Sequence, residues 1–379
     1  MKSQPNVLGK IAMAGTLLSV TVVSSATAED KDLPKPKLTV STTLEFEVKA
    51  NFYNLGGFAR HTAIGAAGSS TDQYFDDGYN KVEGLGFVDN RTYRWGYGNA
   101  SQLAGGAANL HSSTSVANVN SFNNDGGPQP GMGVTYQMPL RKLSHGGHWG
   151  VSAGLNFQAI NVQDKRSLAG NADVLTRSFS TAGSTIPPTP TPPYDGEAGG
   201  FNPATRILNS SVGADTLTTV PGGAVLSGLR ELDAKLFTLK VGPYFEYPLG
   251  KKFTLGGGAG FALGVLASDF NYNETTTIPG MLTAPTVAGA PIPTVGGLAL
   301  GNAEVHRGAS SKTGVLPGAY VNLDLGYEIN SRWSAHLGTQ FRYLGEFNQT
   351  ATDQLGNTRG ARLKLGEALQ IQLGLGYSF

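Results

Sequence analysis

Apolar residues stand at every second position of the carboxy-terminal stretch LQIQLGLGYSF, and this alternation continues to the last residue, Phe379. Strict alternation of this kind indicates a β-strand with one apolar face. The residues between are mostly Gln, Gly and Ser, so the other face is polar or bare. Chain ends of soluble domains usually fray into water. A strand that ends on an aromatic residue therefore indicates an apolar environment around that end.

The same alternation recurs upstream and divides the chain into strands and connections. Connections are short after Leu140, Leu249 and Ile329, and long elsewhere. One end of the strands therefore has tight turns, and the other end has the long connections. Eight stretches carry the pattern: 44–53, 132–138, 149–157, 237–247, 253–265, 315–329, 333–343 and 369–379. The sequence predicts an all-β, antiparallel, up-and-down β-barrel of eight strands. Ten strands are the alternative, because residues 56–130 alternate weakly.

The predicted organisation has three parts. Residues 1–28 read as a signal peptide, with Lys2 and Lys10, a short apolar run and the small residues Ala26 and Ala28 at a cleavage site. Residues 29–43 are expected to be a periplasmic segment. Residues 44–379 are expected to be the barrel, with long outer loops at about 56–130, 161–231, 268–313 and 345–362.

Composition narrows the class of protein. The formal net charge of +1 gives no basis for nucleic-acid binding, and the absence of Cys excludes a disulfide scaffold and thiol catalysis. Charged residues make up only 15% of the chain, below the share of about 25% in soluble domains. No segment after the signal approaches the roughly 20 apolar residues of a membrane helix. If the mature chain enters a membrane, it must enter as strands.

The two faces of the strands predict which side meets the lipid. The face opposite the apolar one is rich in Gly, Ser, Asn and Gln, which suits the narrow interior of a small closed barrel. The apolar face then points outward, and its aromatic residues gather beside the short turns, as in the girdle of a membrane barrel. A thinner second girdle is expected at the other end, from Phe52, Phe157, Phe237, Phe341 and Tyr343. The main girdle comprises Tyr136, Trp149, Tyr247, Phe253, Tyr327, Trp333, Tyr377 and Phe379.

The alternating run ending in GYSF resembles the carboxy-terminal strand of bacterial outer-membrane β-barrels, and the barrel as a whole is similar to the small OmpA/OmpX type. This resemblance implies an outer-membrane location. It also implies that the barrel assembly machinery recognises the last strand, which ends at Phe379. The surrounding lipid and lipopolysaccharide are the other expected partners, and the outer loops are available to extracellular ligands.

The candidate site consists of the charged residues at strand positions that point into the barrel. They could line an ion path or form ion pairs that plug the lumen, and the plug is favoured because so narrow a barrel requires buried charges to be paired. Arg342 and Lys240 are expected to pair with Glu246, Asp324 or Glu328. The predicted lumen charge network comprises Glu45, Glu47, Lys49, Lys240, Glu246, Asp324, Glu328, His336, Arg342 and Lys364.

No motif indicates catalysis. His336 with Asp324 or Glu328 lacks an accompanying nucleophile, and the other histidines lack metal-ligand spacing. Asp76 and Asp77, in FDDGY, could hold a cation but first indicate a turn. The sequence thus predicts no enzymatic activity, no catalytic residue, no metal and no cofactor. The expected role is structural or one of surface interaction, as in an adhesin, with a small-solute or ion pore as the alternative and a barrel-borne enzyme less favoured.

Overall fold

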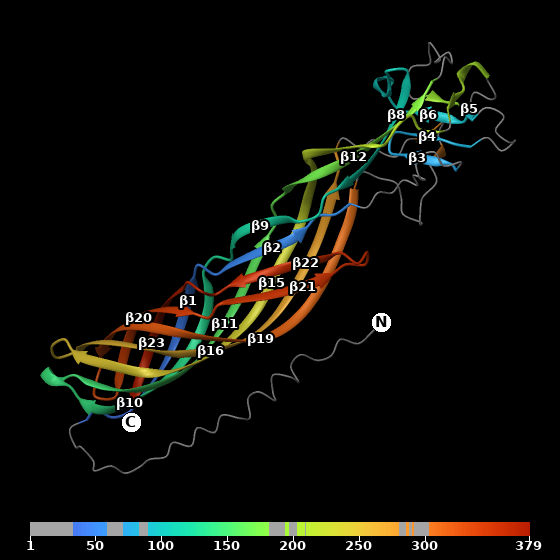
Figure 1. Cartoon of the computed structure of the whole chain (residues 1–379). Helices are drawn as coiled ribbons and strands as arrows, with labels where there is room; N and C mark the ends of the chain where they lie inside the picture. The colour runs from blue at the N-terminus through green and yellow to red at the C-terminus, as the bar shows by residue number, and fades with distance from the viewer. Residues whose placement is uncertain are drawn as a thin grey trace, which may run out of the picture. The chain divides into compact units, whose positions relative to one another are not determined.

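The computed structural model describes residues 33–58, 71–82, 90–181, 194–196, 203–208, 210–279, 286–287, 290–291 and 303–379. The signal peptide predicted at residues 1–28 lies outside this part of the chain. In the described residues one large antiparallel sheet closes into a ring of eight strands, with β11 pairing both β10 and β15 (Figure 1). Around the ring these are β1 (Lys37–Phe46), β10 (Gln129–Lys142), β11 (His148–Asp164), β15 (Thr216–Pro248), β16 (Phe253–Thr277), β19 (Ala303–Glu328), β20 (Trp333–Tyr343) and β23 (Ala368–Ser378).

The prediction of an eight-stranded barrel is confirmed, and the weakly alternating region does not add two strands to the ring. The first strand, however, begins at Lys37 rather than Leu44, inside the segment expected to be periplasmic. Its pairing with β23 places Lys37 beside Ser378 and Phe46 beside Leu369. The first and last strands of the barrel are therefore paired along their full length.

Most ring strands continue upward in a second tier. A sheet in the order β21-β22-β2-β9 joins β2 (Lys49–Leu55), β9 (Val119–Asp125), β21 (Glu346–Thr352) and β22 (Thr358–Lys364), which continue β1, β10, β20 and β23. β12 (Leu168–Ser180) carries on the pairing of β11 along β15, since Leu168↔Leu226 follows Asp164↔Arg230 in register. β8 (Ala107–Ser115) pairs with β12.

The long outer loops predicted from the sequence are therefore largely strands. β12, β21, β22 and the upper parts of β15, β16 and β19 occupy much of 161–231, 268–313 and 345–362. The search for apolar outer faces missed these strands because their polar side chains point outward and their apolar side chains point inward. On β15, charged residues Glu231, Asp233 and Lys235 point outward, while Leu232, Ala234 and Leu236 are buried inside. This is the pattern of a soluble barrel.

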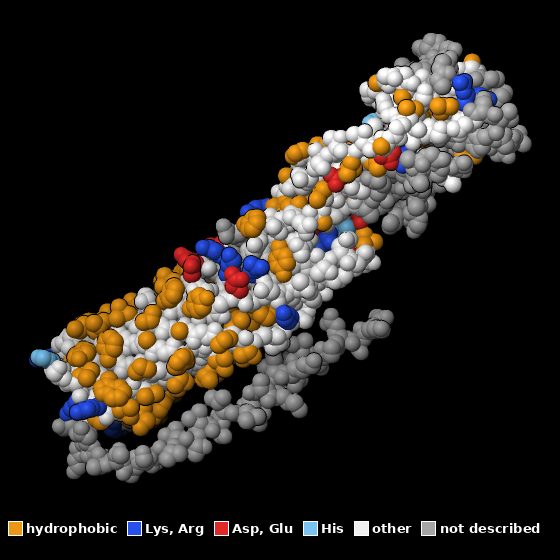
Figure 2. Space-filling model, in the orientation of Figure 1, with side chains coloured by type: hydrophobic (Ala, Val, Ile, Leu, Met, Phe, Trp, Pro, Cys, Tyr) orange, Lys and Arg blue, Asp and Glu red, His pale blue; other side chains and the backbone are white. Residues whose placement is uncertain are grey.

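Lower on the same strands the faces exchange character. The outward residues of β15 become Phe237, Leu239, Val241, Phe245 and Tyr247, while the buried inward ones include Thr238, Lys240 and Tyr244. Figure 2 shows this apolar zone next to the tight turns, with acidic and basic side chains just beyond it. Phe237 to Tyr247 matches the 9 to 11 residues of a tilted membrane crossing. A closed ring with an apolar outer band and aromatic borders is an outer-membrane β-barrel.

In three places the inward-facing positions change from odd to even or from even to odd where a strand of the lower tier meets its continuation: between β1 and β2, between β20 and β21, and between β22 and β23. At the first two of these borders Glu47 and Gly345 have φ of 63° and 77°. One extra residue at such a point turns every following side chain to the other face. As a result Val48 and Phe52 are buried in the upper core instead of facing lipid. The assignment of Phe52 to the second girdle is wrong, because the sequence pattern was extended through the kink at Glu47.

The main girdle residues lie on the outer face or at its lower rim. Ring centroids are 5.2 Å apart for Phe253 and Tyr327, and 5.1 Å apart for Trp333 and Tyr377. Tyr377 also contacts Phe379 at 5.4 Å. Phe379 donates its backbone N–H to the Pro36 carbonyl at 3.2 Å. The last residue is therefore tied to the start of β1 at the aromatic border.

A small packed module, here called the head, is built from the first two outer connections. Its strands are β3 (Gln73–Phe75), β4 (Gly78–Asn80), β6 (Trp95–Tyr97) and β13 (Tyr194–Asp195) in one sheet, and β5 (Arg91–Thr92) and β14 (Ile207–Leu208) in another. Its core contains Phe75, Trp95, Tyr97, Ala108, Leu110, Phe179 and Ile207. The remaining elements are β7 (Leu103–Ala104), β17 (Thr286–Val287), β18 (Ala290–Pro291), η1 (Ala100–Gln102), η2 (Ser144–Gly146) and η3 (Pro203–Thr205).

Among the described residues, no helix has both the length and the apolar character needed to cross a membrane.

Candidate functional site: the barrel interior

A buried ion pair braces the middle of the lumen. Arg342, on β20, places Nη2 2.5 Å and 2.6 Å from the two carboxylate oxygens of Glu45 on β1. The same nitrogen donates to Gln158 Oε1 at 2.9 Å, and Nη1 donates to Thr238 Oγ1 at 3.1 Å. Arg342 and Glu45 are 1% and 0% exposed. Four strands of the ring are thus connected through one guanidinium group.

Side-chain amides fill the space beside this pair. Lys240 Nζ donates to Gln340 Oε1 at 2.5 Å, and Gln340 Nε2 donates to Gln370 Oε1 at 3.2 Å. Asn156 Nδ2 donates to the same Gln370 oxygen at 3.2 Å. These amides connect β11, β15, β20 and β23. The centre of the membrane section is therefore a hydrogen-bonded polar layer.

Above that layer the interior is hydrophobic. Leu236, Leu266, Leu316 and Leu344 are buried there, each at most 8% exposed, and they belong to one core that fills the upper tier. Phe52 and Phe270 stack in this core with ring centroids 5.8 Å apart. A polar layer and an apolar core thus close the barrel in succession above its lower end.

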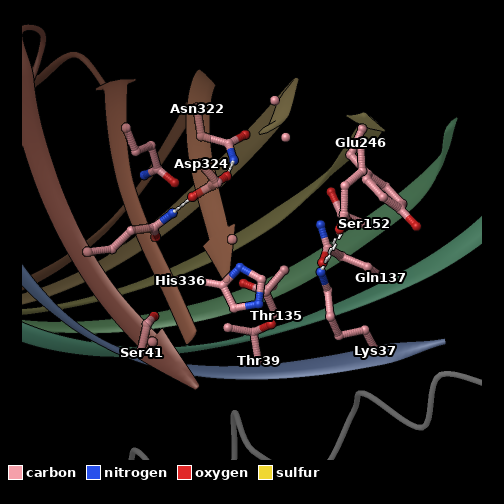
Figure 3. A pocket seen from close by; sticks show the side chains of 18 of the residues that line it. Lys37, Thr39, Ser41, Thr135, Gln137, Ser152, Glu246, Asn322, Asp324 and His336 are labelled. Atoms are coloured by element: carbon pink, nitrogen blue, oxygen red, sulfur yellow. Dashed lines mark hydrogen bonds and ion pairs between the residues drawn. The ribbon is translucent and has the colours of Figure 1, made fainter. Parts of the chain in front are cut away.

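Below the polar layer lies a cavity of about 70 Å³, which receives residues from all eight ring strands (Figure 3). At its lower rim Lys37 Nζ lies 3.1 Å from Glu246 Oε2, and His148 Nε2 lies 3.8 Å from the same oxygen. Asp324 accepts hydrogen bonds from the amides of Asn322 and Gln372. A Cβ on Gly338 would collide with the Asp324 carboxylate, so a side chain at this position of the wall would displace that carboxylate.

The structure places six of the ten predicted lumen residues inside the membrane section: Glu45, Lys240, Glu246, Asp324, His336 and Arg342. The other four were wrongly assigned. Glu47 and Lys364 are exposed and Lys49 is half-buried on the outer face, because of the parity shifts at the tier border. Glu328 is exposed at the lower turn, where its strand leaves the lumen. The predicted pairings were wrong as well, since Arg342 contacts Glu45.

Lys37 was missed because the first strand was started too late. The signal was present in the sequence, since Lys37, Thr39, Ser41 and Thr43 continue the polar parity of Glu45 backward along the chain. Lys37, Thr39 and Ser41 line the cavity. Extending the alternation through these residues would have supplied the partner of Glu246.

A second buried ionic cluster, also missed, lies in the upper tier. Arg230 bonds Glu274, and both side chains are 0% exposed. Arg359 lies 3.4 Å from Glu274 and 3.6 Å from Asp353, while His306 Nδ1 lies 2.8 Å from Asp353. Burial alone would raise the pKa of Asp353, but hydrogen bonds from the Asn357 backbone and from His306 outweigh it and hold that pKa below its usual value. Burial also raises the pKa of Tyr272, beside Arg359, to about 12.

Asp76 and Asp77 fasten the head to β8 rather than forming an open acidic site. Asp77 Oδ1 accepts the His111 backbone N–H at 2.7 Å, and Asp76 Oδ2 accepts that of Ser113 at 2.5 Å. Asp77 Oδ2 lies 2.5 Å from His111 Nδ1, and this hydrogen bond raises the pKa of His111 above 6.5. Trp95 Nε1 donates to the Thr205 carbonyl at 2.7 Å. The two outer connections are thus held together by buried hydrogen bonds.

No group of three or more His, Asp or Glu side chains within the described residues is arranged to hold a metal ion.

No protein-family model matches this sequence, and no curated protein matches it at a significant level. Among solved structures, the chain is similar to the attachment invasion locus protein Ail of Yersinia pestis, with 8% identity, a TM-score of 0.26, and coverage of 91% of this chain and 99% of that one. It is also similar to the Escherichia coli outer-membrane protease OmpT, with 9% identity, a TM-score of 0.34, and coverage of 90% and 97%. The Pseudomonas aeruginosa outer-membrane protein OprG matches with 10% identity, a TM-score of 0.30, and coverage of 91% and 97%.

The expectation of no enzymatic activity is corrected by these comparisons. One of the matched structures is that of an outer-membrane protease, and the prediction that this chain is not an enzyme is withdrawn. The lack of a recognisable catalytic motif in the sequence was therefore no ground for excluding an enzyme.

Proposed function

We propose that this outer-membrane barrel is a closed support that presents the head for interaction at the cell surface. The main support for this proposal is that the first two outer connections pack into a module with its own aromatic core. This module lies on strands that continue far beyond the apolar band. From Thr216 to Lys235, β15 extends roughly 60 Å at about 3.3 Å per residue. A long rigid support of this kind suits binding at a distance from the membrane.

The filled interior supports this role over that of a pore. A pore requires a continuous water path, whereas here the Arg342–Glu45 layer is followed by a hydrophobic core. The side chains that form the polar layer and the hydrophobic core come from opposite walls of the barrel. The strands also form an uninterrupted ring, so the rigid element is the barrel itself.

The partners proposed for the barrel follow from the same architecture. Its apolar band is covered by outer-membrane lipid and lipopolysaccharide, and the strand ending at Phe379 is the segment for recognition by the assembly machinery. The head is the part offered to an extracellular ligand.

The test replaces residues 59–106 and 182–215 by Gly-Ser linkers, which removes the strands of the head and leaves the paired strands β8 and β12. Cells that display equal amounts of the full chain or of this variant are compared for retention on immobilised glycans and matrix proteins. The proposal expects retention by the full chain on at least one surface and a fall to background without the head. Equal retention of both forms on every surface contradicts it.

A further inference from the structure

Two opposite charges face the cavity in the membrane section without forming an ion pair. Lys240 is 6% exposed, and Nζ donates to the Gln340 amide oxygen at 2.5 Å and lies 5.5 Å from the centre of the Tyr320 ring. Among the described residues, no carboxylate oxygen lies within 4.0 Å of this nitrogen. The ammonium group is therefore held only by an amide and an aromatic face.

Asp324 is the corresponding acid. Its carboxylate accepts from the Asn322 and Gln372 amides, and in the described part of the chain no cationic nitrogen lies within 4.0 Å of it (Figure 3). Each of its two oxygens is thus held by a side-chain amide. Lys240 and Asp324 line the same cavity.

This arrangement departs from the rest of the lumen. Glu45 is paired with Arg342, and Glu246 is paired with Lys37. Burying a charge is costly unless it is paired, and that rule explains the two pairs just named. Lys240, which is buried, and Asp324, which is partly buried, depart from this rule, and both line a space large enough for a small ligand. One water needs roughly 10–15 Å³, and the cavity holds about 70 Å³.

We propose that the cavity binds a small zwitterion, a molecule with one anionic and one ammonium group on a short skeleton. The anionic group lies against Lys240 Nζ, and the ammonium group lies against the Asp324 carboxylate. A simple anion would be attracted by Lys240 but repelled by Asp324, and a simple cation would meet the reverse conflict. Because the Arg342 layer and the hydrophobic core close the lumen above, the site is a blind pocket reached from the short-turn end.

The test uses the full chain, refolded in a non-ionic detergent, with glycine as the probe. Glycine binding is measured by calorimetric titration and by the thermal midpoint, which rises with ligand concentration when the ligand binds only the folded state. Acetate and methylammonium, alone and together at the same concentrations, supply the two charges without the link. The proposal expects a saturable rise with glycine that neither separate ion reproduces.

Three variants locate the effect. Lys240→Met and Asp324→Asn should each abolish the saturable part of the response. Lys235→Met is the matched control, because Lys235 lies on the same strand but is exposed on the outer face, and it should respond like the parent chain. Glycine also stabilises proteins as an excluded solute, but that contribution is common to all variants and does not saturate.

Three results would overturn the proposal: no saturable glycine binding by the parent chain, an equal response to acetate alone, or an unchanged response in Lys240→Met. If Lys240→Met does not fold, Asp324→Asn and the titration of the parent chain decide the matter. Water that merely bridges Lys240 and Asp324 would give the first of these results.

Discussion

At the scale of single residues, the interior depends on which charges have partners. Arg342 bonds three polar side chains, one from each of three other strands of the ring, and all three are buried. Arg362, by contrast, lies on the outer face of the upper tier, 43% exposed and 3.7 Å from Glu346. The two arginines offer a direct comparison between a buried and a surface ion pair in one molecule.

Arg342→Ala is expected to destabilise the barrel by about 3–5 kcal/mol, since it leaves Glu45 buried and unpaired. Adding Glu45→Gln should restore part of that loss. Arg362→Ala, the control, should cost at most about 1 kcal/mol. Urea unfolding of the refolded protein in lipid vesicles measures all three. If Arg342→Ala lost no more stability than Arg362→Ala, the stabilising role of the Arg342–Glu45 pair would be contradicted.

The head should lose stability as the pH rises. The hydrogen bond to Asp77, helped by the charges of Asp77 and Asp76, raises the pKa of His111 above 6.5. A group with a raised folded-state pKa contributes its full stabilisation below its unfolded pKa and loses it as the pH rises through the folded one. Limited proteolysis of the head should therefore be slowest near pH 6 and faster above the folded pKa. His111→Gln should remove this pH dependence, and an unaltered profile in that variant would refute the assignment.

At the scale of elements, single strands carry two opposite patterns, and this explains what the sequence could and could not predict. The membrane portions were predictable because large apolar residues alternate with Gly and small polar ones. The upper portions were missed because Leu232 and Ala234 alternate with charges on the solvent side, which resembles an ordinary loop to a search for lipid-facing residues. The lumen site was half predictable for a related reason. Parity placed Arg342 and Lys240 correctly, but a kink such as Glu47 is local backbone geometry that alternation does not reveal.

β16 offers a test of the membrane border on one strand and one face. Leu263 is 42% exposed within the apolar band, and Asn271 is exposed on the same outer face above it. Leu263→Arg is expected to cost roughly 2–4 kcal/mol near the bilayer middle, and Asn271→Arg close to nothing. Folding equilibria in lipid vesicles compare the two. Equal costs would mean that the border between Lys235 and Phe237 is misplaced.

At the scale of the whole molecule, tight turns and long outer connections assign the two ends to opposite sides of the membrane. We expect the turn before Trp333 and the rim residues Lys37 and Glu246 to lie at the periplasmic end. The turn at Gly356 and the head are expected at the outer end. In this orientation the cavity would open to the periplasm and the head would face outward.

Protease sites inserted at these turns report the orientation. A site at Gly213 or Gly356, both with positive φ and in exposed turns, should be cleaved by protease added to intact cells. A site at Ser331, in the exposed turn between β19 and β20, should be cleaved only after the outer membrane is opened. Cleavage at Ser331 in intact cells, with protection at Gly356, would reverse the topology.

The Arg342 layer and the hydrophobic core above it close the lumen. Single-channel current of the purified chain in planar bilayers measures whether ions pass this closure, with the head-deleted variant as the matched control for any blockage by the outer connections. We expect that neither form produces stable conductance steps, because the closure lies within the ring of eight strands. Reproducible ohmic steps from the full chain, at a level set by the salt concentration, would contradict it.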